Sequence, residues 1–180
     1  MAQYVALLRG INVGGQNPVK MTELRAVLEA MGFDDVVTYI ASGNVLFRAP
    51  RQRRADLAAR LEAELTQRFS VELKVVVLTD ALLRAVVANA PQDFGDDDHL
   101  CDVVFLRKPL TAKRAFAVTE TRDGVDRAWQ GADVVYFSRL AARKSSSRLS
   151  KIMALPEYKN MTIRSWGTTT KLLGLISIRT

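Results

Sequence analysis

A glycine-rich segment near the start of the chain carries residue types that could bind an anion. The apolar run Tyr4–Leu8 leads directly into this segment, and a helical pattern begins only near Met21. About ten residues therefore separate strand from helix, where 2–6 are usual, and loops of such excess length are more often functional than connective. Backbone N–H groups and polar side chains of this loop could hold a phosphate. The candidate ligand-binding residues are Arg9, Gly10, Asn12, Gly14, Gly15 and Lys20.

The spacing of the glycines narrows the kind of anion site. Gly10 and Gly15 have the G-x-x-x-x-G spacing of a P-loop, but Gln16-Asn17 follow where that motif needs Lys and Ser/Thr. The loop also lacks the G-x-G-x-x-G pattern of dinucleotide-binding proteins, so a nucleotide hydrolase is disfavoured. Two interpretations stay open: the glycines supply left-handed backbone at a tight bend, or their N–H groups form an anion-binding nest.

A second cationic cluster lies in Arg143-Lys-Ser-Ser-Ser-Arg-Leu-Ser-Lys151. It precedes and overlaps a helix predicted over Ser147–Ala154, with a serine cap at its start. Positive charge at a helix start is disfavoured by roughly 0.3–1 kcal/mol per group, and a bound anion would reverse that penalty. The alternative is a flexible cationic turn whose side chains extend into water. The candidate ligand-binding residues are Arg143, Lys144 and Ser145.

The predicted strand Met161–Trp166 presents a third set of candidates. Alternation places Thr162, Arg164 and Trp166 on one face. Arginine beside tryptophan could stack a base or bind a phosphate, whereas a tryptophan at a strand end could equally be the edge of a core. Thr168-Thr-Thr-Lys171 then offers a second capped helix start. The candidates are Arg164, Trp166 and Lys171.

Two further clusters have simpler explanations. Ser42-Gly43-Asn44 predicts a hairpin turn, with Ser42 and Asn44 retained as candidates that could face the glycine loop. Asp96-Asp-Asp-His99 with Cys101 predicts a solvated acidic loop, because consecutive aspartates cannot point at one ion and no second His or Cys completes a transition-metal shell. We expect no metal and no cofactor.

Composition sets the broad class of protein. The chain has 180 residues, 48% of them hydrophobic, and can bury a real core. The single cysteine excludes an internal disulfide and fits a reducing compartment. The apolar N-terminal run has no basic leader before it and is interrupted by Arg9, and no stretch approaches the ~18 apolar residues of a membrane span. We therefore expect a cytoplasmic protein with no membrane partner.

Charge is spread unevenly along the chain. The net charge is +7, yet residues 91–133 carry six Lys/Arg against nine Asp/Glu, and residues 134–180 carry nine against one. A basic block of this kind suggests nucleic acid or phosphorylated ligands, although a solvated basic face without a ligand has the same composition.

The strands and helices that would position these candidates follow a pattern of apolar residues that occurs twice along the chain. The first round places strands at Tyr4–Leu8, Val36–Ile40, Val45–Phe47 and Leu73–Leu78, with helices on the stripes Leu24–Met31 and Leu57–Phe69. A bridging helix with apolar residues between Leu82 and Val87, and a loop over Ala90–His99, follow. The second round has strands at Val103–Leu106, Val125–Trp129, Val134–Phe137 and Met161–Trp166, and helices from Thr111, over Ser147–Ala154 and from about Thr168.

Both rounds have the order βαββαβ. We therefore predict an α+β protein of two ferredoxin-like plaits, each an antiparallel sheet with helices on one face. The expected divisions are 1–79 for the first plait, 80–99 for the bridging helix and acidic loop, and 100–180 for the second plait with its basic C-terminal segment.

Four motifs carry a resemblance that runs over essentially the whole chain. They are Leu8-Arg-Gly-Ile-Asn-Val-Gly-Gly15, Lys20-Met21, Tyr39-Ile-Ala-Ser-Gly-Asn-Val45 with Phe47, and Arg164-Ser-Trp-Gly-Thr168 with Lys171-Leu172. Together they resemble the bacterial domain-of-unknown-function family 1697. The closing motif departs from the family, which usually has Asn where Ser165 and Gly167 stand here. The resemblance implies a paired α/β-plait fold and no mechanism.

The function expected from these residues is a binding module for a phosphate-bearing ligand or nucleic acid. The alternative is an enzyme acting on a phosphorylated small molecule. Because His99 and Cys101 are the only residues of their types and fall in an apparently exposed loop, catalysis would have to be electrostatic. The residues that would steady a phosphate are then Arg9, Lys20, Lys144 and Arg164. Sequence patterns do not distinguish DNA, RNA and a small molecule.

Overall fold

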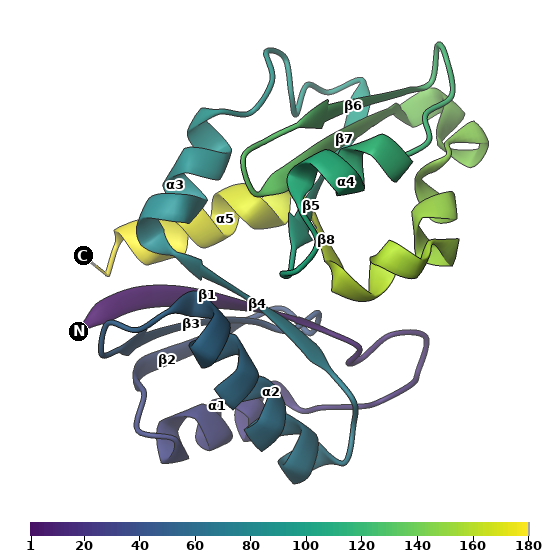
Figure 1. Cartoon of the computed structure of the whole chain (residues 1–180). Helices are drawn as coiled ribbons and strands as arrows, with labels where there is room; N and C mark the ends of the chain where they lie inside the picture. Colours follow the sequence, from purple (N-terminus) through teal and green to yellow (C-terminus); the bar gives the residue numbers. More distant parts are fainter. Residues whose placement is uncertain (180) are drawn as a thin grey trace. The chain divides into compact units, whose positions relative to one another are not determined.

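The chain folds into two compact units, each built around a four-stranded antiparallel sheet (Figure 1). The computed structural model describes residues 1–179. Unit 1 consists of Met1–Leu83 and the described residues from Leu175 onward, and unit 2 consists of Arg84–Gly174. No helix within the described residues combines the length and apolar character needed to cross a membrane.

Unit 1 contains the first βαββαβ round. Its elements are β1 (Ala2–Arg9), α1 (Met21–Ala30), β2 (Asp34–Tyr39), β3 (Asn44–Ala49), α2 (Arg54–Phe69) and β4 (Lys74–Thr79). The strand order is β2-β3-β1-β4, with antiparallel pairing throughout. Alternation along β1 turns Tyr4, Ala6 and Leu8 toward the core that α1 and α2 complete. Both helices lie on the same face of this sheet (Figure 1).

Unit 2 repeats the strand order of unit 1. After α3 (Asp80–Ala88) come β5 (His99–Leu106), α4 (Ala112–Val118), β6 (Asp126–Gln130), β7 (Val134–Leu140), β8 (Met161–Ser165) and α5 (Trp166–Ser177). The sheet order β6-β7-β5-β8 corresponds strand for strand to that of unit 1. The predicted α+β class with two ferredoxin-like halves is confirmed.

The helix predicted over Ser147–Ala154 is wrong. The chain there forms three short 3-10 helices, η1 (Ala141–Ser146), η2 (Leu149–Ala154) and η3 (Pro156–Asn160), where unit 1 has the 16-residue α2. Two bonds from the backbone to side chains contribute to the difference: the N–H of Arg148 donates to the carboxylate of Asp126, 22 residues away, and the N–H of Leu149 donates to Oγ of Ser147. A backbone that bonds to side chains in this way is diverted from an α-helical ladder.

The last helix begins earlier than its sequence pattern indicates. Trp166 is the first residue of α5 rather than the end of a strand, and the cap is Ser165, whose Oγ accepts the N–H of Thr168 at 3.2 Å. The predicted helix start at Thr168 is therefore corrected by two residues. Serine is among the residues preferred at an N-cap, because its hydroxyl can accept a backbone N–H of the first turn.

Candidate anion-binding segments

The structure divides the predicted site residues between the two units. Eight of them lie in unit 1: Arg9, Gly10, Asn12, Gly14, Gly15, Lys20, Ser42 and Asn44. Six lie in unit 2: Arg143, Lys144, Ser145, Arg164, Trp166 and Lys171.

The glycine loop of unit 1, residues 10–17, is a small hairpin. The N–H of Gln16 donates to the carbonyl of Val13 at 2.9 Å, and the N–H of Asn12 donates to the carbonyl of Asn17 at 3.0 Å. Gly14 and Gly15 are the two central residues of the tight turn, with φ of 57° and 75°. Positive φ at both central positions is what a type I′ turn requires. The turn therefore accounts for both glycines, and binding of an anion by their N–H groups stays a prediction.

The side chain of Asn12 closes this loop. Its Nδ2 donates to the carbonyls of Val19 and Ala41, at 2.9 and 2.8 Å, and its Oδ1 accepts the N–H of Val19 at 2.7 Å. Asn12 also adopts a φ of 52°, a conformation that asparagine tolerates better than most residues. These three hydrogen bonds to backbone groups of Val19 and Ala41 hold the loop in its conformation.

The turn between β2 and β3 supports the glycine loop from one side. The N–H of Leu8 donates to the carbonyl of Gly43 at 2.8 Å, and a β-carbon on Gly43 would come within 2.9 Å of side-chain atoms of Leu8 and Ile11. Asn44 is completely buried and donates to the carbonyl of Tyr39 and to Oγ of Ser42. The predicted hairpin is confirmed, and Asn44 has no exposed surface with which to touch a ligand.

The remaining candidates of unit 1 differ in exposure. Gly10 has a φ of 95°, and a β-carbon there would lie 3.1 Å from the carbonyl oxygen of Glu72. Lys20 is largely exposed beside Glu23, with Nζ 3.8 Å from the carboxylate. Arg9 is half-buried at the end of β1, opposite Lys74 in the strand register. Their contact with an anion stays a prediction.

The basic segment of unit 2, residues 141–151, presents its cations outward. Arg143, Lys144 and Ser145 are exposed on η1, and neither cation has an ion pair among the described residues. Arg143 Nη1 lies 3.9 Å from the position that a β-carbon on Gly124 would occupy. Because η1 and η2 have six residues each and are 3-10 in form, the helix-start argument for an anion is withdrawn; the exposed charges themselves remain.

A buried carboxylate holds the basic segment, and sequence reasoning missed it. Asp126 begins β6 and is 7% exposed; its Oδ2 accepts the N–H groups of Arg122 and Arg148, at 2.9 and 2.8 Å. Its Oδ1 is buried without a hydrogen-bond partner in the described structure. The only signal in the sequence is an aspartate within the predicted strand Val125–Trp129, and aspartate is almost never fully buried unless it is paired.

The tertiary structure pairs two cations of the basic block with carboxylates. Arg139 is paired with Asp102 in a largely buried ion pair, and Lys151 lies 4.0 Å from Glu120. Burial raises the pKa of the Asp102 carboxyl, and the neighbouring Arg139 partly counters this effect. The net charge of residues 134–180 therefore overstates the positive surface that a ligand can reach.

The candidates on β8 and α5 are partly committed to the fold. Arg164 is 8% exposed and donates to the carbonyl of Ile163, and burial lowers its pKa to about 10. Trp166 packs edge to face on Phe94 with ring centroids 5.1 Å apart. Lys171 is exposed on α5. The core-edge interpretation describes the packing of Trp166, and Lys171 is the accessible cation of this set.

Asp96, Asp97 and Asp98 are exposed, as expected of a solvated acidic loop. The prediction is wrong for His99 and Cys101, because both residues belong to β5. Cys101 is buried, its Sγ accepts the N–H of Gly95 at 3.2 Å, and burial raises the pKa of the thiol, which disfavours the reactive thiolate. His99 Nδ1 lies 2.7 Å from Asp96, and this hydrogen bond lowers the pKa of the Asp96 carboxyl. Within residues 1–179 no group of three or more His, Cys, Asp or Glu is arranged to hold a metal ion.

Comparison with known proteins gives a family and a fold. Residues 1–136 match the model of the family described as protein of unknown function (DUF1697). The chain is similar to a solved structure, the conserved bacterial protein SP0830 from Streptococcus pneumoniae, at 27% identity and a TM-score of 0.77, covering 96% of this chain and 97% of that one. No curated protein matches.

Proposed function

Because the chain belongs to the DUF1697 family, whose description assigns no function, we propose from its own residues that it is a binding module for phosphate-bearing ligands. The preferred class is the phosphate backbone of nucleic acid, contacted by the basic segment of unit 2. The observation that carries this proposal is the adjacent pair of exposed cations Arg143 and Lys144, which have no carboxylate partner among the described residues.

Support comes from the way the segment is held. The N–H of Ala141 donates to the carbonyl of Asp98 at 2.9 Å, and the N–H of Arg148 donates to buried Asp126. The backbone on either side of Arg143 and Lys144 is thus tied to the sheet, while both side chains extend into solvent. Cations presented in this way contact phosphates largely without reading sequence, and their binding weakens steeply with salt because counterions are released.

The test is a salt titration of binding to a fluorescently labelled, random-sequence single-stranded oligonucleotide, followed by anisotropy. We expect affinity to fall steeply between about 50 and 200 mM salt, and the double variant Arg143→Ala/Lys144→Ala to lower the slope of log K against log salt by about 1.5, the contribution of two phosphates.

The matched control removes the same charge from unit 1. Arg51 and Arg53 are both exposed, so Arg51→Ala/Arg53→Ala changes the net charge equally without touching the basic segment. If both double variants lower the slope of log K against log salt equally, the effect depends only on overall charge and the proposal is contradicted. Undetectable binding at about 50 mM salt would also contradict it.

A further inference from the structure

A hollow of about 290 Å³ opens in unit 2 between the segment that leads into α4 and the 3-10 helix η3. Its polar lining comes from Thr111 and Arg114 on one side and from Glu157, Lys159 and Asn160 on the other. This volume is just below the usual range of small-molecule sites, roughly 300–1,000 Å³, and suits a small ligand. None of these residues belongs to the basic segment described above.

The two walls of the hollow are tied together at their base. The N–H of Arg107 donates to the carbonyl of Asn160 at 2.9 Å, and the N–H of Leu110 donates to the carbonyl of Arg107 at 3.2 Å. Pro109 and Pro156, one in each wall, restrict the backbone further. A site whose walls are fixed before binding loses less entropy when a ligand enters.

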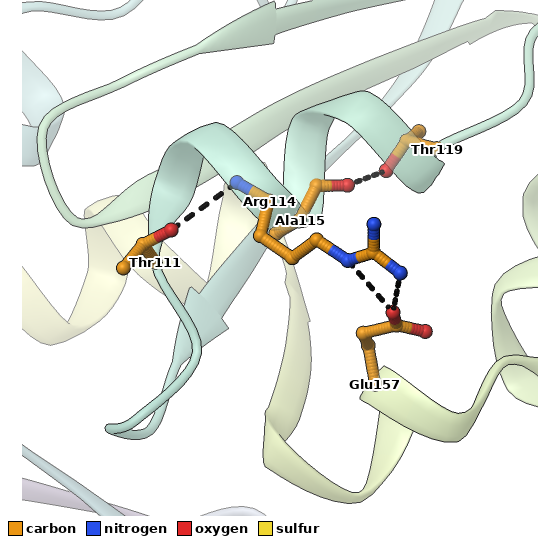
Figure 2. A network of polar contacts seen from close by, with 5 residues as sticks. All are labelled: Thr111, Arg114, Ala115, Thr119 and Glu157. Carbon is orange, nitrogen blue, oxygen red and sulfur yellow. Dashed lines mark hydrogen bonds and ion pairs between the residues drawn. The ribbon is translucent and has the colours of Figure 1, made fainter.

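An ion pair orients the cation of the hollow. Figure 2 shows Arg114 directing two nitrogens at one carboxylate oxygen: Nε and Nη2 lie 2.9 and 2.7 Å from Oε1 of Glu157. The pKa of Glu157 is lowered, by a hydrogen bond from its own backbone and by the Arg114 guanidinium, so the carboxylate stays ionised. The Arg114 side chain is 64% exposed and that of Glu157 only 15%. Glu157 therefore holds the guanidinium from behind while the guanidinium faces solvent.

The remaining groups make the hollow selective for an anion. Nη1 of Arg114 has no hydrogen bond within residues 1–179, and Lys159, also exposed, forms no ion pair there. Glu157 offsets one of the two positive charges, which leaves a net positive lining. The hydroxyl of Thr111 and the amide of Asn160 add neutral hydrogen-bonding groups, and Leu110 with the two prolines adds apolar surface for a ligand body.

We propose that this hollow is a second binding site, for a small organic phosphate whose phosphate group binds Arg114 and Lys159. Glu157 positions the guanidinium and opposes the bound negative charge. The site is independent of the nucleic-acid proposal, since it involves different residues and takes a ligand that fits a hollow of this size.

The experiment is a titration of ¹⁵N-labelled protein with adenosine 5′-monophosphate, with adenosine and inorganic phosphate as separate arms. We expect the monophosphate to shift the amide signals of the non-proline residues in 107–114 and 155–160. Arg114→Gln should weaken this binding about tenfold, as loss of a charge-assisted hydrogen bond requires. Arg25→Gln is the matched control, because Arg25 makes a similar pair with Glu29, at 2.7 Å, on α1.

Glu157→Gln separates binding from structure. The amide keeps the size of the carboxylate and an oxygen that can still accept from Arg114, so the guanidinium stays positioned. It removes only the opposing charge, so affinity for the monophosphate should rise several-fold. Equal or weaker binding by Glu157→Gln would overturn the proposal, as would equal binding of adenosine, or shifts confined to Arg143 and Lys144. Shifts produced by inorganic phosphate but not by the monophosphate would show that the hollow is a site for the free anion and would also overturn it. The oligonucleotide slope of the Arg114→Gln variant should match that of the unaltered chain, which keeps the two proposals distinguishable.

Discussion

The glycine loop of unit 1 and the basic segment of unit 2 were both candidates for an anion site, but they use their polar groups differently. In the glycine loop, the amide of Asn12 and the turn N–H of Gln16 bond back to the protein. In the basic segment, buried Asp126 satisfies the backbone while Arg143 and Lys144 stay exposed. A polar side chain that bonds to the loop backbone, as in the glycine loop, is not available to a ligand. Exposed cations indicate a ligand more clearly where another group, here Asp126, already accepts the backbone N–H groups.

The largest effect is expected from removing the carboxylate that holds the basic segment. Asp126→Ala leaves the N–H groups of Arg122 and Arg148 without their acceptor, which should lower the free energy of unfolding by about 3 kcal/mol. Urea denaturation measures this loss. Asp123→Ala, an exposed change in the same loop, is the control and should cost no more than about 0.5 kcal/mol. Equal losses would mean that Asp126 does not hold the segment.

Loop closure in unit 1 gives the next largest effect. Asn12→Ala removes three hydrogen bonds, whereas Asn17→Ala removes one, from Nδ2 to the carbonyl of Gly10 at 2.8 Å. Both asparagines have φ near 50°, so the backbone cost of alanine cancels in the comparison. We expect Asn12→Ala to be about 2 kcal/mol more destabilising in urea denaturation. A difference near zero would show that the Asn12 side chain does not hold the loop and is available to bind a ligand.

Replacing the turn residue Gly14 should lower the stability less than the two changes above. The same variant tests whether the glycine loop binds an anion. Gly14→Ala introduces a β-carbon into open space at positive φ, so about 1 kcal/mol of backbone strain is the whole expected effect. Gly43→Ala should cost more, because its β-carbon also meets Leu8 and Ile11 at 2.9 Å. Thermal denaturation compares the two variants. If Gly14→Ala also abolishes amide shifts caused by inorganic phosphate, the loop binds anions and the comparison above must be revised.

The smallest expected effect is on the pH dependence of the free energy of unfolding, and it concerns one ion pair in each unit. Burial raises the pKa of Asp102 in the folded state, so this group makes the folded protein bind a proton more tightly than the unfolded chain does. Its contribution to stability is therefore present below the usual aspartate pKa of about 3.9 and is lost as pH rises through the raised value. Asp102→Asn should flatten the pH profile of the free energy of unfolding above pH 4.

Asp35 provides the contrast for that measurement. Its contact with Arg48, at 3.4 Å, is solvent-exposed, and such pairs contribute roughly 0–1 kcal/mol. Asp35→Asn should therefore change the free energy of unfolding little at neutral pH. A profile that Asp102→Asn leaves unchanged would contradict the assignment of the acid-range slope to the buried pair.

The sequence predicts the fold well because its apolar periodicities are local and repeated. Alternation in β1 and the stripe of leucines in α2 specify their buried faces without reference to the rest of the chain. The prediction fails where side chains compete for the backbone. The cluster of serines at 145–147 predicts a helix cap, whereas Ser147 Oγ accepts the N–H of Leu149 within a run of 3-10 turns.

The sequence predicts which residue types could bind an anion, but not which of those residues are accessible to a ligand. The sequence by itself determined the double plait and the excess of cations after residue 134. It left open whether the loop glycines serve a tight bend or an anion, and only the structure shows that Gly14 and Gly15 form a tight turn. Only the tertiary structure decided which cations face water, because pairing of Arg139 with Asp102 and burial of Arg164 depend on strands that are distant in sequence. It also decided that Asp126 is buried and that η3 lies against the start of α4 to form a hollow. Local patterns fix backbone preferences, whereas exposure and charge pairing are properties of the packed sheet.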